Sequence, residues 1–471
     1  MSVATTAHAD FSALSALEQH GARVTASVVD LDSNHVVEQL NANTRLTPAS
    51  LSKLTIAAAA LSSWPADKTF ETRIYGSGPF RDGKVGGDLI LQGAGDATLD
   101  NQSLWVLAAQ VRGAGVSSIG GRLVVQPSPF GPVACETKDR CDALQRSATA
   151  YNAQLSSVGV DYGNWCVDVR PTTPGADAVV GGCSLAQLPI PIEGSVGTVA
   201  SNARTTFWID RVTHDNSDVL RVGGSIPAGS GQRVYRAMSN PALGTGLLLR
   251  ETLREMGISL PGAVVIDPSP LPKGAYALAQ SEGLSLKEQL GRMLRFSNNY
   301  IADVLTLDLA SALSNSPPSL LSDAGRTLSN FVGRVIDHGH RDVSAPTLLS
   351  GSGLTPENEL SASDLVSLLS HQYRETQTFP AFYGGLVVPR QAPFAFLRQG
   401  NANWLDRVAL KTGTMDDPVS VCGIAGYLRK KDGGWMAFGI IVNGGPKQHH
   451  VPLYKAMEAA RGDIESLLAK Y

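Results

Sequence analysis

The chain has little charge and no long apolar run. Only 17% of its 471 residues are charged, and the formal net charge is −3. This balance excludes both the basic surface of a nucleic-acid-binding protein and an acidic solvating tail. No run of 18 apolar residues occurs, so we expect no membrane-spanning helix. The hydrophobic share of 43% is nevertheless sufficient for sizeable cores, and the length predicts more than one structural unit.

Cysteine is also scarce, and its five residues are unevenly spread. Cys135, Cys141, Cys166 and Cys183 lie in one short stretch, whereas Cys422 stands alone. In an oxidising compartment the four predict up to two disulfides, with three possible connectivities. A zinc site is the alternative, but no CxxC pair is present. Cys422 lies in an apolar run, and we expect a buried, inert thiol.

The N-terminal residues lack the charged and hydrophobic parts of a signal peptide. Ala7-His8-Ala9 nevertheless has the small-x-small form of a signal cleavage site. We therefore expect an exported, periplasmic protein whose signal peptide has been removed. The alternative is a disordered cytosolic N-terminus.

Hydrophobic patterning predicts a multi-domain α/β fold with three parts. Helix and strand patterns in residues 1–65 and 275–471 predict one sheet covered by helices on both faces. Between them, short β-like runs alternate with Gly, Pro, Asn and Asp turns, which predicts a large β-rich insertion. We expect an outer insertion domain of residues 66–100 and 195–274, and an inner domain of residues 101–194.

The first candidate for chemistry is Ser50-Leu51-Ser52-Lys53, an S-x-x-K element. Thr47 suits a helix N-cap and Pro48 the first helical position, so Ser50 should lie in the first turn. There the unpaired N–H groups and the helix dipole favour a developing oxyanion. Residues three apart share a helix face, so the Lys53 amine can reach the Ser50 hydroxyl and take its proton. Alone, the pattern is weak, because a chain of this length contains about one by chance.

Two later elements strengthen this candidate. Ser297-Asn298-Asn299 lies between two predicted helices, where helix capping is the alternative interpretation. Lys411-Thr412-Gly413-Thr414 ends a predicted strand, where Gly413 lets a ligand approach the backbone closely. Lys and Thr at that place can bind a carboxylate.

In this order and context, the three elements resemble the signature motifs of penicillin-recognising serine enzymes. Further segments resemble the class C low-molecular-mass penicillin-binding proteins, which are D-alanyl-D-alanine carboxypeptidase/endopeptidases. These segments begin at Asp88, Tyr151, Ser239 and Gly351 and read DLILQGAGD, YNAQL, SNP and GSGL. The resemblance covers nearly the whole chain and implies a penicillin-binding transpeptidase/β-lactamase-like catalytic domain with a large β-rich insertion.

The resemblance also implies roles for individual residues. Ser50 would form the acyl-enzyme with Lys53 as its base, while Ser297 passes a proton to the leaving amine. Asn299 would hold the substrate amide, and Lys411 would support the proton relay. The remaining contacts to substrate would come from Thr412, Gly413, Thr414 and Tyr151, with the N–H groups of Ser50 and Thr414 forming the oxyanion hole. No metal or other cofactor is implied.

The implied partners are peptidoglycan stem peptides and β-lactam antibiotics. Two alternatives remain: a β-lactamase or esterase on the same scaffold, and a non-catalytic protein that binds cell-wall peptides. The sequence departs from the family pattern near the substrate side chain. Arg146 stands where an acidic residue usually recognises a diamino acid, although Asp139 or Asp142 can take its place. Pro356 stands near the position of an arginine that commonly follows the S-G-L-S element, and Ser350 precedes G-S-G where the family usually has an aspartate.

Overall fold

The computed structural model describes residues 11–184, 186–314, 316–336 and 344–471, so Ala7-His8-Ala9 lies outside the described residues. The chain divides into two compact units. Unit 1 comprises Met1–Lys68, Leu286–Ala302 and Ser322–Tyr471, and unit 2 comprises Thr69–Ser285 and Asp303–Leu321.

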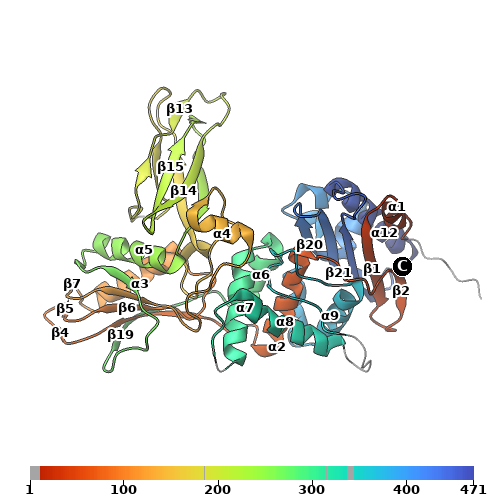
Figure 1. Ribbon diagram of the computed structural model, residues 1–471, viewed down its shortest axis with the longest axis horizontal. Helices are drawn as coiled ribbons and strands as arrows, with labels where there is room; N and C mark the ends of the chain where they lie inside the picture. The colour runs from red at the N-terminus through yellow and green to blue at the C-terminus, as the bar shows by residue number, and fades with distance from the viewer. Residues whose placement is uncertain (1–10, 185, 315, 337–343) are drawn as a thin grey trace, which may run out of the picture. The chain divides into compact units, whose positions relative to one another are not determined.

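Unit 1 is built on one antiparallel sheet of five strands in the order β2-β1-β22-β21-β20. The bounds are β1 Arg23–Asp30, β2 Val36–Leu40, β20 Val408–Met415, β21 Val421–Arg429 and β22 Trp435–Asn443. Strands from both ends of the chain therefore meet in one sheet, which confirms the expected α/β class (Figure 1). β21 and β22 are buried along nearly their whole length, as expected of strands covered on both faces.

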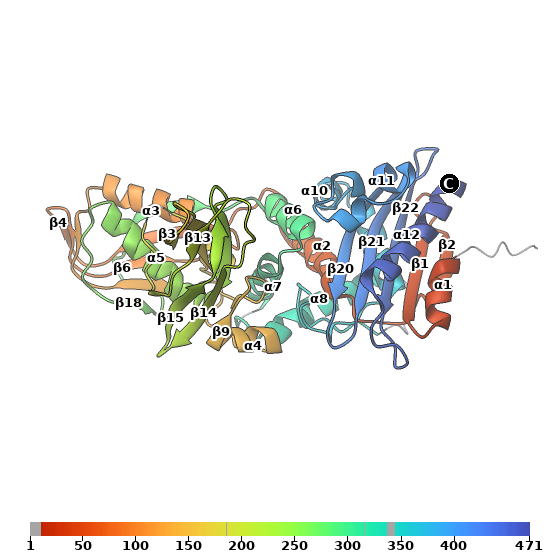
Figure 2. The ribbon, with the colours of Figure 1, turned by 90° about the horizontal axis from the view of Figure 1, so that it is seen from above.

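Helices cover both faces of this sheet (Figure 2). Helices α1 and α12 pack together and contribute Leu14, Ile464 and Leu468 to a core shared with the strands. On the other face, α9 packs on β1, β21 and β22, and the segment with Ser50 packs on β20. The helices are α1 Ser12–Gln19, α2 Lys53–Ser63, α6 Leu286–Phe296, α8 Leu321–Ile336, α9 Ala362–Arg374, α10 Phe379–Gly384, α11 Ala402–Arg407 and α12 Leu453–Lys470. Helix α7 (Asn299–Leu313) begins in unit 1 and continues in unit 2.

Unit 2 contains several small sheets, and the largest has the order β18-β8-β6-β3-β19. Its strands are β3 Glu71–Gly76, β6 Leu89–Gln92, β8 Leu123–Gln126, β18 Val264–Ile266 and β19 Tyr276–Glu282. A second sheet, β12-β15-β14-β9, and a third, β11-β10-β17, use strands between residues 146 and 237. These strands are β9 Arg146–Ser147, β10 Asn164–Arg170, β11 Val179–Gly182, β12 Ile192–Glu193, β14 Trp208–His214, β15 Ser217–Gly223 and β17 Gln232–Ala237.

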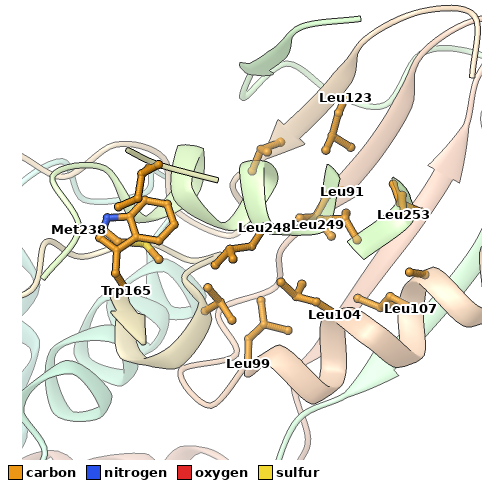
Figure 3. Close-up of a cluster of buried hydrophobic side chains, with 14 of the residues drawn as sticks. Leu91, Leu99, Leu104, Leu107, Leu123, Trp165, Met238, Leu248, Leu249 and Leu253 are labelled. Carbon is orange, nitrogen blue, oxygen red and sulfur yellow. The ribbon is translucent and has the colours of Figure 1, made fainter. Parts of the chain in front are cut away.

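Three helices of unit 2, α3 (Asn101–Gly113), α4 (Lys138–Gln145) and α5 (Pro241–Glu255), were absent from the sequence-based expectation. Of these, α3 and α5 fill the apolar core of this unit with leucines (Figure 3). Both begin with a cap that the sequence contains: Asp100 accepts from the Ser103 N–H, and Asn240 accepts from the Leu243 N–H. The signals were therefore present, and the surrounding turn residues obscured them.

The division of the insertion at residue 101 remains a prediction. In the structure such a boundary would separate β6 from β8, which pair in parallel in one sheet. The boundary at residue 275 would likewise separate β19 from β18, although both belong to that same sheet.

The clustered cysteines form two disulfides, Cys135–Cys141 and Cys166–Cys183, as the sequence predicted. Paired in this way, the thiols do not form the alternative zinc site. Burial raises the pKa of the free Cys422 thiol to about 12, in agreement with an inert residue. Within the described residues, no helix has the length and apolar character to cross a membrane.

Candidate active site

Ser50 lies in a short 3-10 turn, Ala49–Ser52, that leads directly into α2. The expected cap is wrong: the Thr47 hydroxyl donates to the Pro356 carbonyl (2.9 Å) and caps no helix N–H. The Asn443 amide lies at the same point of the chain. In the orientation that satisfies both of its ends, it accepts from the Thr47 N–H (3.0 Å) and donates to the Thr47 carbonyl (3.1 Å). The turn with Ser50 is thus anchored to the end of β22 and to a loop that follows α8.

The backbone around Ser50 is strained and tightly enclosed. Ala49 has a φ of +46°, which is unfavourable for a residue with a Cβ. A Cβ on Gly413 would overlap the Pro48 carbonyl oxygen, and one on Gly353 would overlap the Ala49 carbonyl oxygen. Gly413 therefore admits the turn that carries Ser50, and its expected contact with a ligand stays a prediction. Such a strained backbone at a reactive side chain is typical of functional sites.

Lys53 is completely buried, and its amine contacts three oxygens. The Nζ–O distances are 2.8 Å to the Ser50 hydroxyl, 2.8 Å to the Asn299 side-chain oxygen and 2.7 Å to the Ser352 carbonyl. The expected contact between Ser50 and Lys53 is therefore confirmed. The S-x-x-K element also meets the third residue of the S-x-N element.

Lys411 forms the second half of the cluster. Its amine donates to the Ser297 hydroxyl (2.9 Å) and to the Thr412 carbonyl (2.7 Å). Burial lowers the pKa of Lys411 well below its usual value, and the nearby charge of Lys53 lowers it further. Burial therefore disfavours the charged form of Lys411 relative to a solvated lysine.

The S-x-N element both caps helix α7 and contacts the two lysines of the site. Asn298 accepts from the Ile301 N–H (2.9 Å) and so caps α7, as the alternative interpretation proposed for this segment. Its two neighbours instead face the lysines, since Ser297 binds Lys411 and Asn299 binds Lys53. Ser297 has a φ of +57°, which gives the cluster a second strained residue.

The structure thus brings together Ser50, Lys53, Ser297, Asn299 and Lys411. Thr412 and Thr414 follow on β20, in register with Ile424 and Cys422 of β21. Tyr151 belongs to unit 2, where its hydroxyl donates to the Asp139 carboxylate (3.2 Å). A role of Tyr151 in substrate binding therefore stays a prediction.

Sequence reasoning missed residues that contact the cluster through the backbone. The Ser352 carbonyl accepts from the Lys53 amine. The Ser350 hydroxyl accepts from the Gly353 N–H (3.1 Å) and so fixes the loop of residues 350–353. Carbonyl groups leave no residue-type signal, so only the resemblance of Gly351-Ser352-Gly353-Leu354 to a family segment marked this loop. Asn443 left no signal either, because it lies at the end of an ordinary buried strand.

Comparison with known proteins places the chain in a family. A profile of the D-Ala-D-Ala carboxypeptidase 3 (S13) family matches residues 8–461. The D-alanyl-D-alanine carboxypeptidase of Actinomadura sp. (strain R39) is 29% identical over 94% of this chain and 80% of the relative. The D-alanyl-D-alanine carboxypeptidase DacB of Haemophilus influenzae is 25% identical over 94% of this chain and 90% of its own length.

The fold is also found among solved structures. Penicillin binding protein 4 of Haemophilus influenzae superposes with a TM-score of 0.75 over 97% of this chain and 99% of that chain, at 22% identity. A predatory endopeptidase of Bdellovibrio bacteriovorus superposes with a TM-score of 0.53 at 15% identity, over 95% of this chain and 94% of that chain. These likenesses show a shared fold that contains both the sheet of unit 1 and the large insertion.

Proposed function

Because the chain belongs to the D-Ala-D-Ala carboxypeptidase 3 (S13) family, we propose that it is a periplasmic serine D,D-peptidase of peptidoglycan that acts through Ser50. One observation carries the proposal: the Ser50 hydroxyl lies 2.8 Å from the buried amine of Lys53. A serine hydroxyl is a weak nucleophile until a base takes its proton, and Lys53 is within reach to do so.

In the proposed acylation, Ser50 attacks the carbonyl carbon of the penultimate D-alanine while its proton passes to Lys53. The N–H groups of Ser50 and Thr414 stabilise the oxyanion. When the intermediate collapses, Ser297 gives its proton to the leaving amine. The proton that Lys53 took from Ser50 then returns to Ser297, and Lys411, hydrogen-bonded to Ser297, supports this relay electrostatically.

Thr412 binds the terminal carboxylate, and Asn299 holds the substrate amide in addition to Lys53. Water then hydrolyses the acyl-enzyme and regenerates Ser50. A β-lactam acylates Ser50 in the same way, and its adduct is released slowly. The bond cleaved is D-Ala–D-Ala in a carboxypeptidase reaction, and D-Ala–diamino acid in an endopeptidase reaction.

We further propose that Tyr151 and Asp139 recognise the amine of the diamino acid. Their 3.2 Å hydrogen bond places a carboxylate beside an exposed ring, although Arg146 occupies the usual acidic position. Arg146 itself pairs with Asp210 in unit 2.

A fluorescent penicillin followed by mass spectrometry tests the proposal. We expect a long-lived adduct on Ser50 that disappears in Ser50→Ala. Rapid turnover of the β-lactam would instead indicate a β-lactamase, and the absence of any adduct would contradict the serine-peptidase proposal. Digestion of purified cross-linked muropeptides then separates carboxypeptidase from endopeptidase activity.

A further inference from the structure

Asn358 is a completely buried amide that is hydrogen-bonded on both sides. Its nitrogen donates to the Ser52 hydroxyl (2.9 Å) and to the Ser350 carbonyl (2.8 Å). Its oxygen accepts from the N–H groups of Leu349 (2.8 Å) and Ser350 (3.3 Å). A buried amide with four such contacts fixes the elements it joins, because each lost bond would leave a buried polar group unsatisfied.

The two elements that Asn358 joins are both parts of the site. Ser52 lies on the nucleophile turn, between Ser50 and Lys53. Ser350 begins the loop that ends at Gly353, and the carbonyl of Ser352 in this loop accepts from the Lys53 amine. The loop is closed internally, since Ser350 accepts from the Gly353 N–H and the Ser352 hydroxyl accepts from the Leu354 N–H, both at 3.1 Å. Asn358 therefore ties a rigid loop to the turn with the nucleophile.

The position of the Ser352 carbonyl decides where the Lys53 lone pair points. A neutral lysine amine has two N–H donors and one lone pair. The Asn299 oxygen and the Ser352 carbonyl can only accept, so each takes one N–H. In the charged amine the third N–H donates to the Ser50 hydroxyl at 2.8 Å. In the neutral amine that acts as the base, the lone pair faces this hydroxyl, which alone among the three contacts described can donate. This arrangement is the one that removes the Ser50 proton.

We propose that Asn358 is a positioning residue for acyl transfer, which holds the Ser352 carbonyl against Lys53 and so directs the base toward Ser50. This inference rests on the proposed function, because it assigns Asn358 to the acylation step. Asn358 contacts neither Ser50 nor Lys53 and acts through Ser52 and the loop 350–353.

The test compares Asn358→Asp and Asn358→Ala with the wild-type enzyme. Aspartate has the same shape and keeps both acceptor contacts, but it cannot donate to the Ser350 carbonyl. We expect the rate constant of Ser50 acylation by a fluorescent penicillin to fall about 10- to 100-fold per folded molecule, because small displacements of a base have effects of this size. The dissociation constant of the non-covalent complex should remain within about twofold, because Asn358 does not contact substrate.

Gln372 provides a matched control. It is also a completely buried amide of unit 1, and it donates to the Thr378 hydroxyl (2.8 Å), which is not part of the site. Gln372→Glu and Gln372→Ala should lower the melting temperature but acylate at the wild-type rate per folded molecule. Wild-type acylation in Asn358→Asp and Asn358→Ala, or an equal loss in the Gln372 variants, would overturn the proposal.

A crystal structure of Asn358→Asp separates this inference from the proposed function. We expect the Ser352 carbonyl to move out of hydrogen-bonding distance of Lys53. A retained contact would contradict the positioning role even if the wild-type protein proved unreactive toward penicillin. Conversely, wild-type protein without any Ser50 adduct would contradict the proposed function alone.

Discussion

Both units bury cationic side chains, but they hold them differently. In unit 2, Arg140 donates to the carboxylate of Asp303 at 2.6 Å, with both side chains almost inaccessible to solvent. In unit 1, the hydrogen bonds described for Lys53 and Lys411 go to hydroxyl, amide and carbonyl oxygens, and the charge of Lys53 lowers the pKa of Lys411. In unit 2 the buried cation is thus part of a structural ion pair, whereas in unit 1 burial destabilises the charged form of Lys411. Burial alone therefore does not identify a functional cation. The oxygen atoms that surround the cationic side chain do.

The largest effect should follow from replacing Lys53 by Met. The apolar chain fills similar space but cannot accept a proton, so we expect acylation of Ser50 by penicillin to slow by about 10²- to 10⁴-fold. The free energy of unfolding should fall by no more than about 1–3 kcal/mol, because the Asn299 and Ser352 oxygens lose the Lys53 donor while the cost of burying the amine is removed. Stopped-flow acylation and urea unfolding measure the two quantities. A large loss of stability with unchanged acylation per folded molecule would remove the distinction between the units.

Arg140→Met should show the opposite pattern, with a large loss of stability and unchanged acylation of Ser50 per folded molecule. It leaves the buried Asp303 carboxylate without Arg140, which typically costs about 3–5 kcal/mol of stability. Arg146→Met is the matched control, because its pairing with Asp210 is exposed on the arginine side. That variant should change the free energy of unfolding by less than about 1 kcal/mol. Equal stabilities of the two variants in urea titrations would contradict a structural role of the buried pair.

The two disulfides also distinguish the units, since both lie in unit 2. Replacing Cys166 and Cys183 by Ser opens a loop with a sequence separation of 17, and we expect the free energy of unfolding to fall by about 2–4 kcal/mol.

The free thiol of Cys422 in unit 1 should be unreactive, because its raised pKa keeps it protonated at neutral pH. Iodoacetamide should leave Cys422 of the folded protein unmodified. Rapid alkylation of Cys422 would contradict its description as buried and inert.

Three short elements that resemble family motifs singled out Ser50, Lys53, Ser297, Asn299 and Lys411. The structure brings these five residues together, while their catalytic roles stay predictions. The sheet of unit 1 was also predictable, since its strands and helices have clear apolar periodicity. The four clustered cysteines predicted disulfides, although spacing alone could not choose between the connectivities.

The remaining features depend on contacts that a sequence pattern does not contain. The Ser352 carbonyl and the left-handed Ala49 arise from how the loop and the turn pack together. Gly413 lies on the expected strand, and the close approach of the neighbouring turn to it is a contact that the sequence did not predict. In unit 2, short strands far apart in the sequence pair in one sheet, and local patterns do not contain such pairings.

The smallest effect concerns two carboxylates whose pKa values are shifted in opposite directions. In unit 2, burial and the nearby charge of Asp100 raise the pKa of Asp161 to about 7. In unit 1, burial also opposes ionisation of Asp30, but hydrogen bonds from Lys430 and Ser33 outweigh it and lower the pKa to about 2. Since the folded pKa of Asp161 exceeds its unfolded value, its contribution to stability is lost as pH rises from about 4 to about 7. For Asp30 the contribution is lost as pH falls from about 4 to about 2.

Asp161→Asn should therefore raise the free energy of unfolding at pH 8 by about 1–2 kcal/mol, because water relieves part of the penalty at this partly exposed side chain. At pH 4 the same variant should match the wild-type protein, in which Asp161 is already protonated. Asp30→Asn should be destabilising at pH 8, and its deficit should shrink as the pH approaches 2. Urea titrations at these three pH values measure both differences. A change in stability that is the same at pH 4 and pH 8 for Asp161→Asn would mean that its carboxylate is not held protonated by burial, and this contrast between the two units would then disappear.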